Sequence, residues 1–163
     1  MKKLMETASL ESLGTNAEVI SKTDGHQYLT FRLCDQDFGI DILRVQEIKN
    51  YSLITPIPNT PSYVKGAMNL RGSVVPIVDL RIKFGMPENE YDQYTVIIIV
   101  NVAERVLGLV VDSVTDVINV GLDDFEPTPE LGLDVDTSFM EGLAKTEDRL
   151  TTLLNLEELL REN

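Results

Sequence analysis

The stretch FGIDILRVQEI, residues 38–48, returns 69 residues later as LGLVVDSVTDV, residues 107–117. Gly39 corresponds to Gly108 in this alignment. The first stretch opens with the apolar–polar alternation that is typical of a half-buried strand. After Ile42 the apolar residues are spaced by three, which predicts a β-bulge or a single helical turn at this point.

The correspondence continues on both sides of these stretches. The alternating apolar residues of the preceding strand, 29–33, fall on 98–102, and the later segments 56–58, 62–66 and 74–78 fall on 127–129, 138–142 and 150–154. Any two β-rich segments with glycine turns resemble each other to some degree. Here, however, the order of strands, proline connector, short helix and capped helix is kept throughout. We therefore infer an internal duplication.

This duplication predicts a mainly β fold. We expect two small subdomains, each closed as a five-stranded barrel or nearly so, with short helices and a C-terminal helix over 155–160. Subdomain 1 would span about 27–91 and subdomain 2 about 92–160, with strand exchange between them possible. Residues 94–100 are apolar on both faces, which predicts a strand buried near the junction of the halves. Residues 1–25 predict a flexible tail ahead of a domain over 26–163.

Start and stop signals predict further short elements. Thr60 followed by Pro61 would begin a short helix that ends at Gly66. Asp79 would cap a helix over 80–84. Pro76 places the strand over 74–78 at an edge or a bulge, because proline cannot donate to the ladder of a sheet.

The charge balance is strongly acidic: 27 acidic against 14 basic residues give a formal net charge of −13. Such a surface repels phosphate backbones and anionic lipids, so we expect neither a nucleic-acid partner nor direct membrane insertion. The longest apolar run, residues 96–100, is far too short to span a bilayer. A single cysteine permits no internal disulfide, and residues 1–16 do not form a convincing signal peptide, so we expect a cytoplasmic protein.

The sequence lacks the residue sets that common catalytic and metal sites need. His26 is the only histidine and Cys34 the only cysteine, so no zinc site can be assembled. A Ser-His-Asp arrangement would need His26 to be held rigidly, and it directly follows the flexible tail. We predict no catalytic site, no metal and no cofactor. Arg71, in a tight turn, either satisfies turn carbonyls or contacts a partner.

Five segments in order resemble the CheW family. They are FGIDILRVQEI (38–48), PIPNTP (56–61), VKGAMNLRG (64–72), VPIVDLR (75–81) and GLVVDSVTDV (108–117). The resemblance covers about residues 27–160, and no central motif departs from the family pattern. The family also includes the regulatory domain of the histidine kinase CheA. A chain of 163 residues has no room for a kinase or a receiver domain, which favours a stand-alone adaptor.

This resemblance implies a non-catalytic adaptor that couples methyl-accepting chemoreceptors to CheA in bacterial chemotaxis arrays. It implies two SH3-like five-stranded β-barrel subdomains. The chemoreceptor tip would lie in an apolar groove between them, and the CheA regulatory domain would bind another face. The protein would be cytoplasmic, associated with membrane-bound receptor arrays, and a monomer when free.

The matching motifs imply which residues form the receptor site. One wall of the groove would carry Ile42, Val45 and Ile48, the other Val111 and Val114, and Glu47 would lie beside them. Asn69, Arg71 and Gly72 would form a turn that is sensitive to changes in the fold or the partner. If Val45 lines the groove, Val45→Lys should keep the fold and weaken receptor binding.

Two alternatives fit the same sequence. The same fold could serve as a regulatory binding module of a receptor–kinase system outside chemotaxis. Clustered carboxylates could instead support a small hydrolase, which would need an Asp or Glu with a strongly raised pKa in a concave site.

Overall fold

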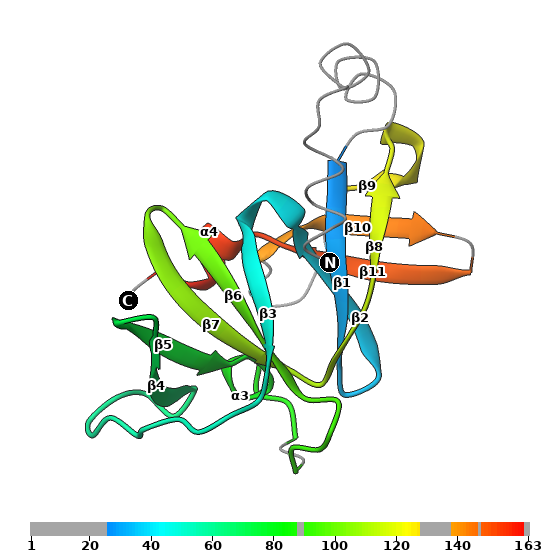
Figure 1. The fold of residues 1–163 in the computed structure, drawn as a ribbon. Coiled ribbons are helices and arrows are strands. Elements are labelled where there is room, and N and C mark those ends of the chain that lie inside the picture. The colour runs from blue at the N-terminus through cyan, green and yellow to red at the C-terminus, as the bar shows by residue number, and fades with distance from the viewer. Residues whose placement is uncertain (1–25, 88–89, 128–137, 147, 162–163) are drawn as a thin grey trace.

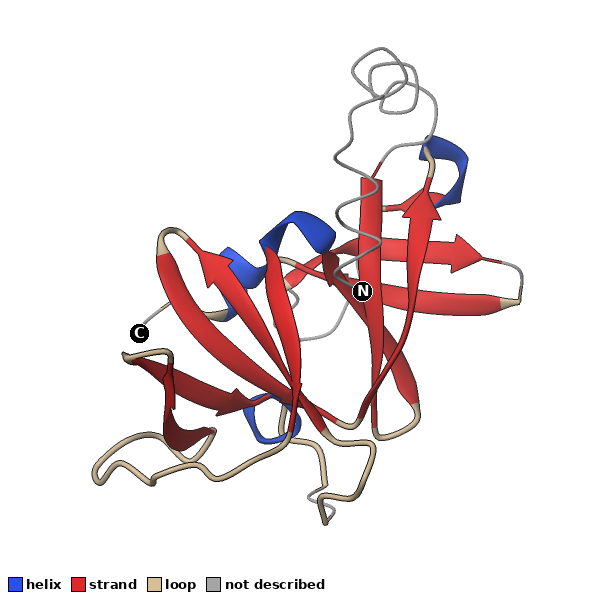
Figure 2. Cartoon of the chain, viewed as in Figure 1, coloured by secondary structure: helices blue, strands red, loops and turns tan. Residues whose placement is uncertain are grey.

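The computed structural model describes residues 26–87, 90–127, 138–146 and 148–161 (Figure 1). The tail expected over 1–25 lies outside these ranges. The described residues form two β-sheets connected by turns and short helices (Figure 2). The prediction of a mainly β fold with short helices is confirmed.

Strand order distinguishes the two sheets. The five-stranded sheet has the order β3-β6-β7-β5-β4, and the six-stranded sheet has the order β8-β1-β2-β11-β10-β9. The strands are β1 (His26–Leu33), β2 (Gln36–Asp41), β3 (Val45–Asn50), β4 (Val64–Leu70), β5 (Ser73–Asp79), β6 (Val96–Val102), β7 (Arg105–Val111), β8 (Ser113–Val120), β9 (Phe125–Glu126), β10 (Met140–Thr146) and β11 (Arg149–Leu154). The helices are α3 (Leu80–Lys83) and α4 (Leu156–Leu159), with 3-10 turns η1 (Ile42–Arg44) and η2 (Leu122–Asp124).

The two halves of the chain exchange their first hairpins. The hairpin β1–β2 comes from the first half but pairs with β8 and β11, and the hairpin β6–β7 from the second half pairs with β3 and β5. A boundary near residues 91 and 92 therefore does not coincide with the division into sheets. One sheet also has six strands where five were expected, because β9 adds two residues to the edge of β10.

Strand registers confirm the duplication. In the five-stranded sheet Val45 pairs with Val100, and the register shifts before Glu47. The equivalent pair in the six-stranded sheet is Val114 with Phe31, and the register shifts at the same place. The two sheets thus share a bulge as well as a strand order.

The paired glycines of the repeated stretch lie under side chains of a parallel neighbour. A Cβ on Gly108 would lie 2.6 Å from Cδ1 of Ile77, the residue beside it on β5. A Cβ on Gly39 would lie 3.2 Å from Cδ2 of Leu153, its neighbour on β11. Glycine recurs at this point because the parallel strand brings a large apolar side chain over the backbone.

Strand β6 separates two hydrophobic clusters. Ile98 belongs to the large cluster shared by both sheets and the helices, and Ile97 and Ile99 belong to a smaller cluster of the five-stranded sheet. All three side chains are fully buried. The prediction of a strand that is buried on both faces near the junction of the halves is confirmed.

Short polar caps begin the two helices. The carboxylate of Asp79 accepts hydrogen bonds from the amides of Arg81 and Ile82, and Asn155 accepts one from the amide of Glu158. Both caps match the sequence prediction. The helix expected after Thr60 is wrong, because β4 begins at Val64 and continues through the glycine that was predicted to end a helix.

At two equivalent positions the six-stranded sheet buries a threonine where the five-stranded sheet buries an apolar residue. Thr30 and Thr151 are buried there, at the positions that Ile99 and Val75 occupy in the five-stranded sheet. Both threonines line a hollow of about 370 Å³. The Thr30 hydroxyl contacts the Thr115 hydroxyl at 2.6 Å and donates to the carbonyl of residue 116. Among the described residues, the Thr151 hydroxyl has no hydrogen-bond partner.

This difference predicts opposite effects of one substitution. Thr151→Val is expected to raise the free energy of unfolding by about 1 kcal/mol, because it removes a buried hydroxyl without a partner. Thr30→Val is expected to lower it by about 1 kcal/mol, since the hydroxyl of Thr115 loses its contact. Urea unfolding followed by circular dichroism measures both values. If both variants lose a similar free energy of unfolding, the Thr151 hydroxyl is not the unpartnered group described above.

Candidate functional site

The changed spacing of apolar residues after Ile42 corresponds to a helical turn followed directly by a β-bulge. Asp41 caps the turn η1 by accepting a hydrogen bond from the amide of Leu43 at 2.9 Å. Strand β3 then begins at Val45 and shifts its register against β6 before Glu47. The two interpretations of the sequence therefore describe adjacent parts of one structure.

The apolar residues of the expected groove all border the large hydrophobic cluster. Ile42, Val45 and Val111 lie inside it, with 8%, 3% and 0% of their surface exposed. Ile48 and Val114 are half-buried at its border. Only the latter two offer surface to a partner in this conformation. Val45→Lys would bury a charge in the core, so the structure leads us to expect that this variant loses stability instead of keeping the fold.

Two further apolar residues near this site reach the surface. Val117, which corresponds to Ile48, is also half-buried against the large cluster. Leu43, in the turn η1, has 82% of its surface exposed. The alignment of the two halves already contained the signal for Val117. Nothing in the pattern of the sequence distinguished Leu43 from its buried neighbours.

Arg71 links the predicted turn to the predicted groove. Its guanidinium donates to the carboxylate of Glu47 on β3, and the two form an ion pair. The turn between β4 and β5 has positive φ at Arg71 (53°) and Gly72 (89°), and Asn69 Oδ1 accepts from the Gly72 amide at 2.9 Å. These angles are those of a tight hairpin turn. Arg71 thus contacts a side chain on another strand rather than the turn carbonyls.

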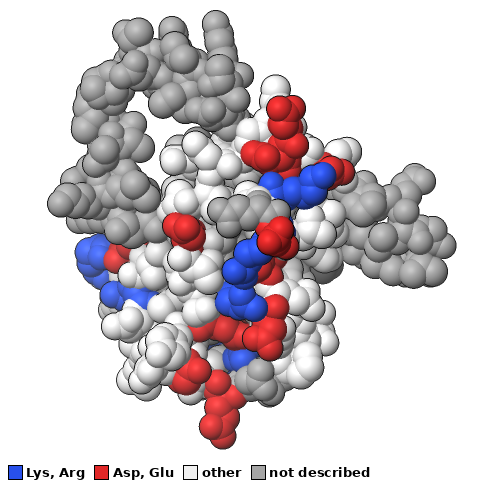
Figure 3. All heavy atoms as spheres, turned by 90° about the vertical axis from the view of Figure 1, so that its right-hand side faces the viewer, with Lys and Arg blue, Asp and Glu red and all other residues white. Residues whose placement is uncertain are grey.

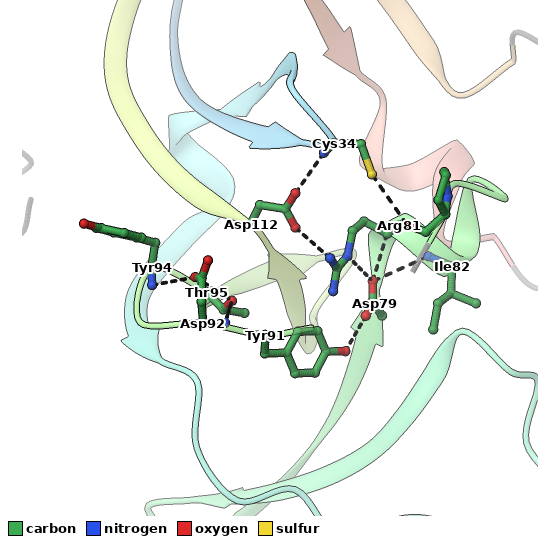
Figure 4. Close-up of polar contacts among 10 residues, drawn as sticks. Cys34, Asp79, Arg81, Ile82, Tyr91, Asp92, Tyr94, Thr95 and Asp112 are labelled. Atoms are coloured by element: carbon green, nitrogen blue, oxygen red, sulfur yellow. Dashed lines mark hydrogen bonds and ion pairs between the residues drawn. The ribbon is translucent and has the colours of Figure 1, made fainter. Parts of the chain in front are cut away.

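A buried polar cluster joins the two sheets (Figure 4). Arg81 contacts Asp112, at the end of β7, at 3.3 Å, and contacts Asp79, at the end of β5, at 3.8 Å. Asp112 also accepts from the backbone amide of Cys34 at 2.8 Å, in the turn between β1 and β2. The cluster therefore connects a hairpin of the six-stranded sheet to two strands of the five-stranded sheet.

The remaining partners of this cluster leave no free carboxylate oxygen on Asp79. One oxygen accepts from the amides of Arg81 and Ile82, and the other accepts from the hydroxyl of Tyr91. Burial, and then the hydrogen bond to Asp79, raise the pKa of Tyr91, so this hydroxyl keeps its proton at neutral pH. Asp79 is 1% exposed and holds the fold together; it is not placed as a base for a substrate.

Cys34 takes part in the same cluster through its backbone. Its thiol donates to the carbonyl of Pro87 at 3.6 Å, and burial, followed by the charge of Asp112, raises the pKa of the thiol. A raised pKa disfavours the reactive thiolate. These contacts favour a structural role for Cys34 over a nucleophilic one.

Neither metal ligands nor a membrane span is found in the described ranges. Nowhere in them do three His, Cys, Asp or Glu side chains gather closely enough to hold a metal ion. Every helix in the same ranges is too short or too polar to cross a membrane.

Comparisons with known proteins agree on one family. The family model for the CheW-like domain matches residues 27–163. Chemotaxis protein CheW of Klebsiella aerogenes is 41% identical over 151 residues, which cover 93% of this chain and 91% of that protein. Chemotaxis protein CheW of Rhizobium meliloti is 39% identical over 145 residues, with 89% and 94% covered.

A solved structure gives the same answer for the fold. The crystal structure of the scaffolding protein TtCheW from Thermoanaerobacter tengcongensis superposes with a TM-score of 0.78 at 36% sequence identity. The superposition covers 85% of this chain and 94% of that one. Sequence, strand order and these matches together show that the chain belongs to the CheW family of chemotaxis scaffold proteins.

Proposed function

We propose that this protein couples the cytoplasmic tips of methyl-accepting chemoreceptors to the histidine kinase CheA. Membership of the CheW family supports this role. The observation that carries it is the pair of edge strands, β3 and β8, which occupy equivalent positions in the two sheets. Each presents half-buried apolar residues over one shared hydrophobic cluster. A helical receptor tip is a suitable ligand, because such helices dock through spaced apolar anchors.

The receptor contact would divide its residues into two groups. Ile48 and Val114 would touch the receptor, and Glu47, oriented by Arg71, would meet polar receptor groups. Ile42, Val45 and Val111 would support this surface from the core. On this proposal each sheet forms one SH3-like barrel, and the receptor lies where the two barrels meet.

The adaptor would act without catalysis and in the cytoplasm. The carboxylate of Asp79, which is deeply buried, is fully occupied by structural donors. On the face shown in Figure 3, basic and acidic side chains are interleaved, without a broad basic patch for nucleic acid or anionic lipid. The protein would therefore reach the membrane-bound arrays through the receptors and CheA.

Substitution of a half-buried groove residue tests the receptor contact. Val114→Lys is expected to weaken binding to receptor-containing membranes at least about tenfold, equivalent to about 1.4 kcal/mol, because a charged group replaces an apolar anchor. The long lysine stem can still cover the cluster while its ammonium reaches water, so the protein should stay folded. Cosedimentation with receptor-containing membranes gives the dissociation constant.

Asn119→Lys is the matched control for that experiment. Asn119 lies on the same strand, β8, but is exposed and does not border the large hydrophobic cluster. Asn119→Lys adds the same charge as Val114→Lys, and this variant should bind receptor-containing membranes as tightly as the original protein. Equal binding by the two variants, with both folded, would show that Val114 does not contact the receptor.

A further inference from the structure

The five-stranded sheet opens between two of its strands. β5 and β7 run parallel and pair only from Ile77 and Gly108 onward, and before this point they diverge (Figure 1). In the six-stranded sheet the equivalent ladder begins one residue earlier, where Thr152 pairs with Phe38. Pro76 stands at the position of Thr152 and has no N–H to donate. The proline therefore accounts for the later start of this ladder, which then continues to Asp79 and Val110.

A hollow of about 450 Å³ lies at this opening. We call it the β5–β7 hollow. Its apolar lining includes Tyr63, Val64, Pro76, Val106 and Leu160. It contains none of the residues assigned to the receptor contact, so it is a separate surface.

The duplication shows which side chains pack together at the equivalent place of the six-stranded sheet. In the other half, Phe84 stacks on Phe38 with ring centroids 5.7 Å apart and packs on Phe139 at 5.0 Å. By the offsets of the repeat, the corresponding residues of the β5–β7 hollow are Leu160, Leu107 and Tyr63. Two of the three rings are missing there. Phe84 and Phe139 themselves border a hollow of about 470 Å³, so the two places are both open and differ in the number of aromatic rings beside them.

Two basic side chains at this hollow form no ion pair with a described carboxylate. Of the seven arginines, six lie within 4.0 Å of a described carboxylate, and the other is Arg105, whose side chain lines the hollow. Lys83 also lines it, with its ammonium 4.0 Å from the centre of the Tyr63 ring and without an ion pair to any described carboxylate. In a chain with a net charge of −13, unpaired cations around an apolar hollow indicate an acidic ligand.

We propose that the β5–β7 hollow binds an acidic segment of a partner protein that inserts a large apolar side chain, preferably an aromatic one. The inserted side chain would take the place that the aromatic ring of Phe84 takes in the other half. Carboxylates next to it in the segment would pair with Arg105 and Lys83. The surface would serve as a second docking point, whichever receptor the chain binds.

The test uses a capped tetrapeptide with phenylalanine and leucine between two glutamates, titrated to millimolar concentration into the ¹⁵N-labelled full chain. We expect chemical-shift changes confined to the neighbourhood of Tyr63, Val106 and Leu160. The same peptide with lysines in place of the glutamates should cause none. Arg105→Glu should weaken binding roughly fivefold or more, since it turns an attraction into a repulsion, and Arg105→Lys should retain it.

Lys49→Glu is the matched control, because Lys49 lies on β3 and also forms no ion pair with a described carboxylate. It should bind the acidic peptide within about twofold of the original chain. Equal effects of Arg105→Glu and Lys49→Glu, or equal shifts with the acidic and basic peptides, would overturn the proposal. Shifts at the hollow caused by raising the protein concentration alone would assign it to a second copy of the chain, and would also overturn it.

Discussion

Asp79→Ala is expected to lower the free energy of unfolding by about 3–5 kcal/mol, because it leaves the buried guanidinium of Arg81 with one carboxylate fewer. Asp79 and Arg81 are only 1% and 3% exposed, so water cannot replace the lost contacts. The hydroxyl of Tyr91 loses its acceptor at the same time, and α3 loses its cap. Urea unfolding followed by circular dichroism measures the change.

Asn155→Ala separates the cap from the polar cluster. Asn155 occupies the same place before α4 and caps it, but it has no ionic partner among the described residues. Its loss should cost about 1 kcal/mol, the usual effect of removing a helix cap. If the two alanine variants lose the same stability, the cluster around Asp79 contributes nothing beyond its cap.

Gly66→Ala is the second substitution with a large expected effect. Gly66 has a φ of 145°, and a Cβ there would lie 2.1 Å from the carbonyl oxygen of Thr55. The backbone of residue 55 bridges to β4 at this point, so it cannot move without breaking that bridge. Backbone strain and the overlap of the new Cβ with residue 55 together should lower the free energy of unfolding by roughly 3–5 kcal/mol.

Gly72→Ala is the control for backbone conformation alone. Gly72 also has positive φ, 89°, but a Cβ there would meet nothing within 4 Å. Gly72→Ala should lower the free energy of unfolding by only about 1 kcal/mol. Urea unfolding of both variants gives the comparison. A loss for Gly66→Ala that is no larger than for Gly72→Ala would show that β4 does not approach residue 55 as closely as described.

The sequence predicted the elements better than their partners. Local patterns identified the strands around residues 29–33 and 98–102, the caps of both helices and the strand buried on both faces. Strand exchange between the halves was expected only as a possibility, because each hairpin presents the same edge and either half could accept it. Gly66 was assigned to the end of a helix, since the sequence does not distinguish a glycine needed for close backbone approach from a helix stop.

For the site, the sequence identified individual residues but not their contacts or their burial. The motifs identified Glu47 and Arg71 separately, but their ion pair spans two strands that only the folded chain brings together. The resemblance assigned Val45 and Val114 to the walls of the groove without fixing how deeply each is buried; Val45 is in the core and Val114 is at its border. Asp112 lies within the segment 108–117, but its role depends on Arg81 and Cys34, which lie far away in sequence.

The direct test of the adaptor role is CheA autophosphorylation from ATP with receptor-containing membranes, in the presence and absence of this protein. Receptors and kinase should come from the same organism as the chain. We predict that the protein raises phosphate incorporation severalfold, and that attractant removes the gain. Unchanged kinase activity, with the protein folded and the receptors able to bind it, would contradict the proposal that it couples receptors to CheA.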